Sequence, residues 1–298
     1  MIVFVFALLS LIWGSTWLVI KVGLEDLTPF WFATGRFIIA VSPLLLLILL
    51  RKRKLPRLQG EWAVIGITGF LIFGVNYALV FWGENYISSG LAAILYTFLP
   101  LFGMIFSHFY RRVEQFTLIK MLGILLGIVG VGIIFQHQVH VGQDMAIWGS
   151  LAILTASLAT AFGGVLIKAH GTHLDTLTLT TGQMVAGLIP LMTLALIFEP
   201  LPSLPAIPVR AWLSMVYLGV LGSAVTFLLA NWLIKKIPVT TTQLIPFPTT
   251  LLAVWLGVLV LGEPLHEGTL LGGTLVLGGM LLATRKHFGL KGQRARIP

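Results

Sequence analysis

The sequence predicts an all-α integral membrane protein in which ten transmembrane helices form two inverted five-helix repeats. Three observations lead to this fold class. The chain of 298 residues is 57% hydrophobic and only 10% charged, whereas a soluble domain carries about 25% charged residues. Its apolar residues gather into stretches of the length that spans a bilayer. Residues of the first half recur in the second half at a nearly constant offset.

Helices are expected because lipid cannot satisfy unpaired backbone groups. A β-barrel would alternate apolar and polar residues, and the run "LLLLILL" (Leu44–Leu50) does not. The first stretch lacks a basic leader and is long, so we expect a retained helix rather than a signal peptide. The ten expected spans are 2–22, 29–50, 62–83, 87–109, 117–135, 145–168, 174–198, 211–234, 238–261 and 268–285.

Basic residues cluster in alternate connections, and this pattern predicts the orientation of the helices. The positive-inside rule makes the basic face cytoplasmic, which places both termini in the cytoplasm and the protein in the cytoplasmic membrane. The net charge of +9 then reflects orientation, and nucleic acid is not an expected partner. The basic residues are Arg51–Arg57, Arg111, Arg112, Lys235, Lys236, Arg285, Lys286, Lys291, Arg294 and Arg296.

The internal match indicates a duplication, with repeats at residues 1–140 and 141–298. Five spans per repeat is an odd number, so the second copy enters the membrane in the opposite sense, as in many secondary transporters. Duplication for stability alone is the alternative. The matched pairs are Ser10–Ser157, Lys21–Lys168, Thr34–Thr181, Gly35–Gly182 and Pro43–Pro190 at an offset of 147, and Glu114–Glu263, Gly123–Gly272 and Gly130–Gly279 at an offset of 149.

Polar and aromatic residues in the middle of several spans indicate a central cavity. In "SLIWGSTWLVIK" (Ser10–Lys21), Trp13 lies about 16 Å into the first span, far from the surfaces where tryptophans gather. The alternatives are that Trp13 faces lipid or a neighbouring helix, that Ser15 and Thr16 only bond to backbone carbonyls, and that Gly14 only permits close packing. Beyond Trp13, the candidate lining residues are Ser15, Thr16, Trp17, Asn76, Tyr77, Tyr96, Pro100, Thr226, Asn231 and Gln243.

Two further features of the spans bear on this cavity. Arg36 lies about 10 Å inside the second span, where an arginine costs roughly 2.5–3.5 kcal/mol or more. It either snorkels or binds helix carbonyls, or it pairs with Glu84 or an anionic substrate. Pro246 and Pro248 lack amide donors and are expected to kink the ninth span.

The sequence offers little for catalysis. The chain has no cysteine, no phosphate-binding G-x-x-x-x-G-K-[ST] sequence and no paired histidines of a zinc helix in "LHEG" (Leu265–Gly268). Ser89 and His108 alone do not indicate a catalytic nucleophile with its general base. We therefore expect neither an enzyme nor a cofactor or metal.

"WGSTW" (Trp13–Trp17), "GRF" (Gly35–Phe37) and "LGE" (Leu261–Glu263) resemble the EamA-like branch of the drug/metabolite transporter superfamily. The resemblance implies ten helices around a central cavity and movement of small metabolites, often export. It also implies that Trp13, Trp17, Asn76, Tyr77, Tyr96, Thr226, Asn231 and Gln243 line the cavity. "TAFGG" (Thr160–Gly164) replaces "WGSTW" in the second half and "RRVE" (Arg111–Glu114) replaces "LGE" in the first, so an asymmetric cavity is expected, more aromatic on the first-repeat side.

Together these observations predict a permease that works by alternating access in the lipid bilayer, as a monomer or homodimer. Its solutes are expected to be amino-acid-like, aromatic or cationic, because aromatic faces suit planar or cationic groups. The alternatives are an exchanger of anionic or phosphorylated metabolites, for which basic residues are scarce, and a membrane scaffold that transports nothing.

Overall fold

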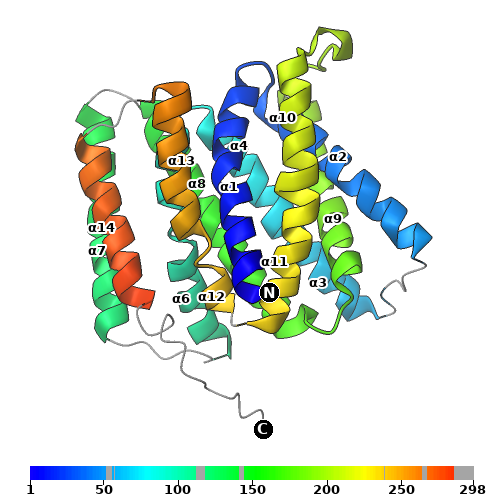
Figure 1. The fold of residues 1–298 in the computed structure, drawn as a ribbon, viewed down its shortest axis with the longest axis horizontal. Coiled ribbons are helices and arrows are strands. Elements are labelled where there is room, and N and C mark those ends of the chain that lie inside the picture. The colour runs from blue at the N-terminus through cyan, green and yellow to red at the C-terminus, as the bar shows by residue number, and fades with distance from the viewer. Residues whose placement is uncertain are drawn as a thin grey trace.

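The computed structural model describes residues 1–51, 56, 58–111, 118–140, 144–237, 239–263 and 267–284. Every regular element within these ranges is a helix (Figure 1), as the sequence predicts. In the described residues, seven helical stretches are long and apolar enough to cross a membrane, and a shorter apolar helix covers Pro248–Leu261. The seven are Ile2–Leu24, Pro29–Leu50, Gln59–Glu84, Ser89–Tyr110, Met145–Gly171, Thr176–Phe198 and Val209–Lys236. The count of ten spans stays a prediction.

A helix nevertheless lies at the position of each expected span. Three of the helices contain a short π-helical segment, and two expected spans consist of two helices separated by a break. The elements are α1 (Ile2–Leu24), α2 (Pro29–Leu50), α3 (Gln59–Gly69), η1 (Phe70–Val75), α4 (Asn76–Glu84), α5 (Ser89–Tyr96), α6 (Leu99–Arg111), α7 (Leu118–His140), α8 (Asp144–Leu166), η2 (Ile167–Gly171), α9 (Thr176–Phe198), η3 (Leu204–Ala206), α10 (Val209–Gly219), η4 (Val220–Val225), α11 (Thr226–Lys236), α12 (Val239–Thr242), α13 (Pro246–Leu261) and α14 (Glu267–Thr284).

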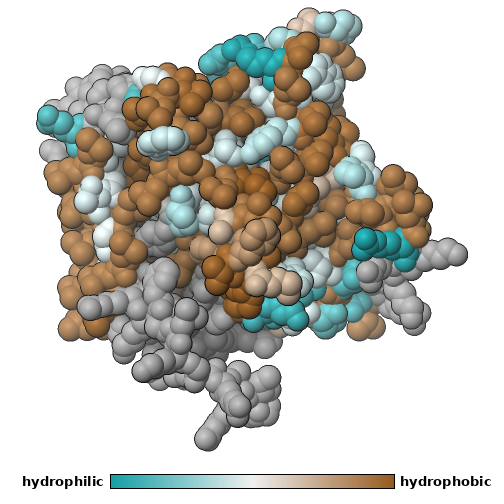
Figure 2. Space-filling view, viewed as in Figure 1, coloured by the Kyte–Doolittle hydropathy of each residue, from teal (hydrophilic) through white to brown (hydrophobic). Residues whose placement is uncertain are grey.

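The outside of the bundle is apolar. Figure 2 shows hydrophobic residues over most of the visible face, and large side chains such as Leu11, Leu251 and Trp255 are more than half exposed. A soluble monomer rarely exposes such large contiguous apolar patches. Together with the long apolar helices, this surface describes a multi-pass membrane protein.

Helices α7 and α14 pack together at one side of the bundle (Figure 1). Glycines make this close approach possible: a Cβ atom on Gly130 would lie 2.5 Å from the carbonyl oxygen of Gly272, and one on Gly279 would collide with the carbonyl of Gly123. Small residues at such interfaces let two backbones approach closely within lipid. The glycine-rich face of α14 is therefore a packing surface for α7 at these positions.

Two local features recur at a nearly constant distance along the chain. The π-helical segments η1 and η4 begin at residues 70 and 220. The Nζ atom of Lys21 donates hydrogen bonds to the carbonyls of Glu84 and Ile87, at 2.7 and 2.8 Å. That of Lys168 donates to the carbonyls of Ile234 and Ile237, at 2.7 and 3.0 Å. Each lysine thus ties its own helix to the end of a second helix.

Both broken spans are interrupted beside a proline. The ninth expected span breaks at Gln243–Ile245, immediately before Pro246, so the predicted distortion is confirmed. The fourth breaks at Thr97–Phe98, two residues before Pro100, and this break was not predicted. Irregular backbone at membrane depth is tolerated where it is covered by protein or lines a cavity.

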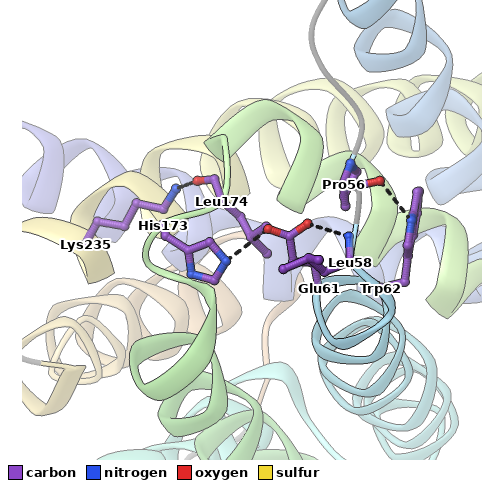
Figure 3. Close-up of polar contacts among 7 residues, drawn as sticks. All are labelled: Pro56, Leu58, Glu61, Trp62, His173, Leu174 and Lys235. Carbon is purple, nitrogen blue, oxygen red and sulfur yellow. Dashed lines mark hydrogen bonds and ion pairs between the residues drawn. The ribbon is translucent and has the colours of Figure 1, made fainter.

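Polar contacts at the end of the bundle where α3 begins link the start of α3, the connection after η2 and the last turn of α11 (Figure 3). Glu61 accepts a hydrogen bond from the Leu58 amide at 3.1 Å and lies 3.2 Å from His173 Nε2. Lys235 donates to the carbonyl of Leu174, the residue after His173. Basic residues after the eighth span thus lie at the same end as the connection after the second. The remaining predicted basic clusters, Lys52–Lys54, Arg57, Arg112 and the tail, fall outside the described residues, as do "RRVE" beyond Arg111 and the first two residues of "LHEG".

Candidate functional site

A cavity of about 140 Å³ lies among the helices of the bundle. An engineered apolar cavity of about 150 Å³ is large enough to bind benzene, so this space can hold a small solute. The broken spans contribute to its wall through Tyr96 and Leu99 on one side and Gln243 and Pro246 on the other. The aromatic residues of the wall are Trp13, Trp17, Phe73, Tyr77, Tyr96 and Phe227. All but Phe227 precede residue 140, so the lining is asymmetric in the expected sense.

Both tryptophans of α1 line this cavity, and Trp13 also contacts neighbouring helices, as one of the alternatives holds. Trp13 Nε1 donates to the carbonyl of Gly222 at 3.3 Å, and its ring lies 5.3 Å from that of Phe227. Trp17 meets the ring of Tyr96 edge-on at 5.5 Å. Gly14 packs against Leu252 of α13, so it permits close helix packing, as one of the alternatives predicts. Aromatic rings at a cavity wall are suited to contact a planar solute.

Arg36 is buried, with 1% of its surface exposed, and borders the cavity. Its Nε donates to Ser223 Oγ at 2.7 Å and its Nη2 to the carbonyl of Gly222 at 2.9 Å. Its guanidinium carbon lies 4.6 Å from the ring centre of Tyr77, a cation–π distance. Nη1 has no hydrogen-bond partner. The structure therefore shows Arg36 bound to a helix carbonyl, as one of the two predicted alternatives holds. Its Nη1 group is left to donate to a further acceptor.

Amides and hydroxyls form the polar part of the wall. The Tyr96 hydroxyl donates to Asn76 Oδ1 at 2.9 Å and lies 3.0 Å from Thr160 Oγ1. Asn231 Nδ2 donates to Gln183 Oε1 at 3.0 Å, and Gln183 Nε2 donates to a hydroxyl of α3 at 2.7 Å. Buried polar networks of this kind fix side-chain positions when their members are satisfied. The wall therefore offers oriented neutral dipoles and one cation.

Nine of the twelve predicted residues line the cavity, and three do not. Ser15 bonds to the carbonyl of Ile12 and to the hydroxyl of Tyr217, Thr226 is fully buried behind the wall, and Pro100 follows the break without reaching the cavity. Contact with a solute remains a prediction for all twelve. The nine are Trp13, Thr16, Trp17, Arg36, Asn76, Tyr77, Tyr96, Asn231 and Gln243.

Several polar lining residues were not predicted from the sequence. Gln183 is the clearest, because an offset of 147 from Arg36 leads to it (36 + 147 = 183), and the same offset leads from Trp13 to Thr160. Thr242 and Thr249 also belong to the wall. Applying the offset of 147 to the candidate residues would have found Gln183 and Thr160.

Charged groups at the end where α1 finishes lie outside this wall. Arg210 bonds to Asp26 at 2.8 Å and to Glu25 at 2.7 Å, and it holds the pKa of the Asp26 carboxyl below its usual value. Glu263 accepts bonds from the amides of Ser89 and Gly90, at 2.8 and 3.2 Å, and so caps the first turn of α5. Within the described ranges, no three acidic or histidine side chains come together to hold a metal ion.

Comparison with known proteins assigns this chain to a protein family. The EamA-like transporter family matches residues 1–136 and 147–285. The chain therefore belongs to the EamA-like transporter family.

Individual relatives agree with that class. The chain is 28% identical to the uncharacterized transporter YoaV of Bacillus subtilis, over 92% of this chain and 94% of that protein. It is 29% identical to the uncharacterized inner membrane transporter YedA of Escherichia coli, over 94% and 89%. A crystal structure of another protein has the same fold, with a TM-score of 0.69 and 18% identity, over 97% of this chain and 98% of the other.

Proposed function

We propose that this protein is a secondary transporter that moves small aromatic, amino-acid-like solutes across the cytoplasmic membrane, with both termini in the cytoplasm. The observation that carries the proposal is the cavity among the helices, whose wall combines packed aromatic rings, oriented amides and a single arginine. A ligand pocket that is mostly apolar with a few convergent polar groups is the usual form of a small-molecule site.

Alternating access between two inverted repeats, residues 1–140 and 141–298, is the proposed mechanism. Three observations support it: the family matches the chain in two separate ranges, π-helical segments begin 150 residues apart, and Lys21 and Lys168 make equivalent bonds to the ends of α4 and α11. Two copies of one scaffold can exchange conformations, which opens the cavity to each side in turn.

Arg36 narrows the solute class. A guanidinium at the cavity wall repels a cation in a medium of low dielectric constant and attracts a carboxylate. The aromatic faces around Trp17 and Tyr96 favour a planar side chain. A solute with a ring and a carboxylate fits this wall better than a cationic amphiphile does.

Four probes that share a phenyl ring test the charge preference: L-phenylalanine, phenyltrimethylammonium, benzenesulfonate and phenyl phosphate. Each is offered to proteoliposomes and to protein-free liposomes. We expect L-phenylalanine to enter faster than the cation. Preference for phenyl phosphate would favour the phosphorylated-metabolite exchanger instead, and no flux of any probe would favour the scaffold.

A matched pair of tryptophan variants tests the cavity itself. Trp17→Ala removes a ring from the cavity wall, whereas Trp255→Ala removes a ring that is 59% exposed on α13. We expect Trp17→Ala to lower the initial rate at least fivefold and Trp255→Ala to change it less than twofold. Equal rates for the two variants, with both proteins folded in detergent, would remove the cavity from the transport path.

A further inference from the structure

Glu84 is the last residue of α4, and its carboxyl group is sealed inside the protein. The residue has 0% of its surface exposed, and neither carboxylate oxygen has a hydrogen-bond partner. Burying an ionised carboxylate without partners costs far more than a single hydrogen bond contributes. The geometry seen here is therefore one that suits a carboxyl group carrying a proton.

Glu84 lies one helical turn beyond the cavity. Val80, four residues earlier on α4, and Ile20, the neighbour of Lys21 on α1, both line the cavity wall. Residues four apart on a helix lie one above the other, about 6 Å apart. Glu84 and Lys21 thus form a polar layer between the cavity and the end of the bundle where α1 finishes.

Three charged groups face Glu84 from the elements around it. Lys21 comes from α1, Arg36 from α2, and Glu263 from the connection after α13. Glu263 is already bonded to the first turn of α5 and Arg36 to residues of η4. On α8, which packs closely against α4, the groups next to Gly83 are the backbone of Gly149 and the apolar side chain of Ile153.

Lys21 gives Glu84 a second possible state. Its ammonium has three N–H donors, and two of them bond to the carbonyls of Glu84 and Ile87. The third N–H is left for the Glu84 carboxylate once that group is ionised and Lys21 moves toward it. Loss of a proton from Glu84 would then redirect Lys21, which ties α1 to the end of α4 above the cavity.

We propose that Glu84 is a proton-binding site that couples one proton to each solute cycle, an inference that rests on the proposed transport function. In each cycle an O–H bond forms on Glu84 with a proton taken from water on one side of the membrane. That bond breaks when the proton passes to water on the other side. When Glu84 carries a proton, the polar layer stays sealed as in this structure. When Glu84 is ionised, Lys21 turns toward its carboxylate and the layer opens.

Glu84→Gln tests the coupling because glutamine keeps the shape and stays neutral. The assay uses proteoliposomes, the phenyl probe that the wild type moves fastest, and a membrane potential held at zero. A gradient of one pH unit can drive up to about tenfold accumulation at one proton per solute. We expect the wild type to approach that value and Glu84→Gln to accumulate nothing, while exchange of labelled for unlabelled probe stays within twofold of the wild type.

Glu25→Gln is the matched control, since Glu25 lies at the same end of the bundle but is exposed and bonded to Arg210. It should keep the full pH-driven accumulation. Accumulation by Glu84→Gln at the wild-type level, or loss of exchange together with accumulation in a folded variant, would overturn the proposal. Exchange without pH-driven accumulation in the wild type would overturn the coupling and leave the transport function standing.

Infrared spectroscopy of the protein alone provides a readout that does not depend on the solute. A protonated carboxyl group has a C=O stretch that a carboxylate and an amide lack. We expect one such band near neutral pH in the wild type and in Glu25→Gln, and its loss in Glu84→Gln. Its absence from the wild type would refute proton binding at Glu84, whether or not any probe is transported.

Discussion

Replacement of Gly69 by alanine tests the helix contact that positions the amide side of the cavity. A Cβ atom at this position would lie 2.5 Å from the backbone oxygen and 2.8 Å from the Cα atom of Gln183. Because real Cβ contacts essentially never fall below 3.0 Å, the helices must separate by at least 0.5 Å (3.0 − 2.5). Neither atom can move aside as the end of a flexible side chain could.

Overpacking of this kind costs about 1–3 kcal/mol, which lowers the melting temperature by about 2–5 °C in a chain of this size. Gly66→Ala is the control on the same helix, since a Cβ atom at Gly66 would have nothing within 4 Å. The melting temperature of both variants is measured by tryptophan fluorescence in detergent. Equal melting temperatures for Gly69→Ala, Gly66→Ala and the wild type would refute the close contact between α3 and α9.

Three further variants test single interactions. Glu263→Ala removes the carboxylate that caps α5 and should cost about 1–3 kcal/mol in thermal unfolding, whereas the exposed Glu267→Ala should change little; an equal effect of both would deny the cap. Arg210→Gln releases Asp26, whose lowered pKa contributes stability above its unfolded pKa of about 3.9. The variant should melt below the wild type at pH 7, with the difference closing as the pH falls through the lowered pKa of Asp26 and this carboxyl gains a proton; a difference independent of pH would contradict this. Tyr96→Phe breaks the hydroxyl network of the cavity and should slow L-phenylalanine exchange several-fold with little change in melting temperature, so unaltered exchange would count against its role.

Positions of the helices could be predicted because the thickness of a bilayer sets their length. The expected second span, 29–50, coincides with α2 (Pro29–Leu50). The break before Pro246 was also predictable, since proline removes an amide donor. The break at Thr97–Phe98 and the π-helical segments were not, because a local change in hydrogen-bond pattern leaves the hydropathy of a span unchanged.

The candidate site was predictable where a residue type conflicts with lipid. Trp13 and Arg36 are out of place in a plain anchor, and both border the cavity. Thr226 also carries a polar group, but it is buried against neighbouring helices instead. Sequence alone does not distinguish a position at the cavity wall from one buried between helices, because a polar group can find partners within the protein at either position. The sealed position of Glu84 depends on packing between several helices and was likewise not predicted.

The contacts of Arg36 and Gln183 show that the two halves of the cavity wall differ in their side chains while sharing a backbone arrangement. A Cβ atom on Gly219 would approach the backbone oxygen of Arg36, just as one on Gly69 would approach that of Gln183. The two glycines are 150 residues apart and the two polar residues 147, so one backbone contact occurs twice in the chain. At one copy the side chain is a guanidinium bonded to Ser223, and at the other it is an amide bonded to Asn231. The two repeats thus present similar backbone frameworks with different charge at the cavity wall, and we predict that an anionic group of a solute binds on the Arg36 side.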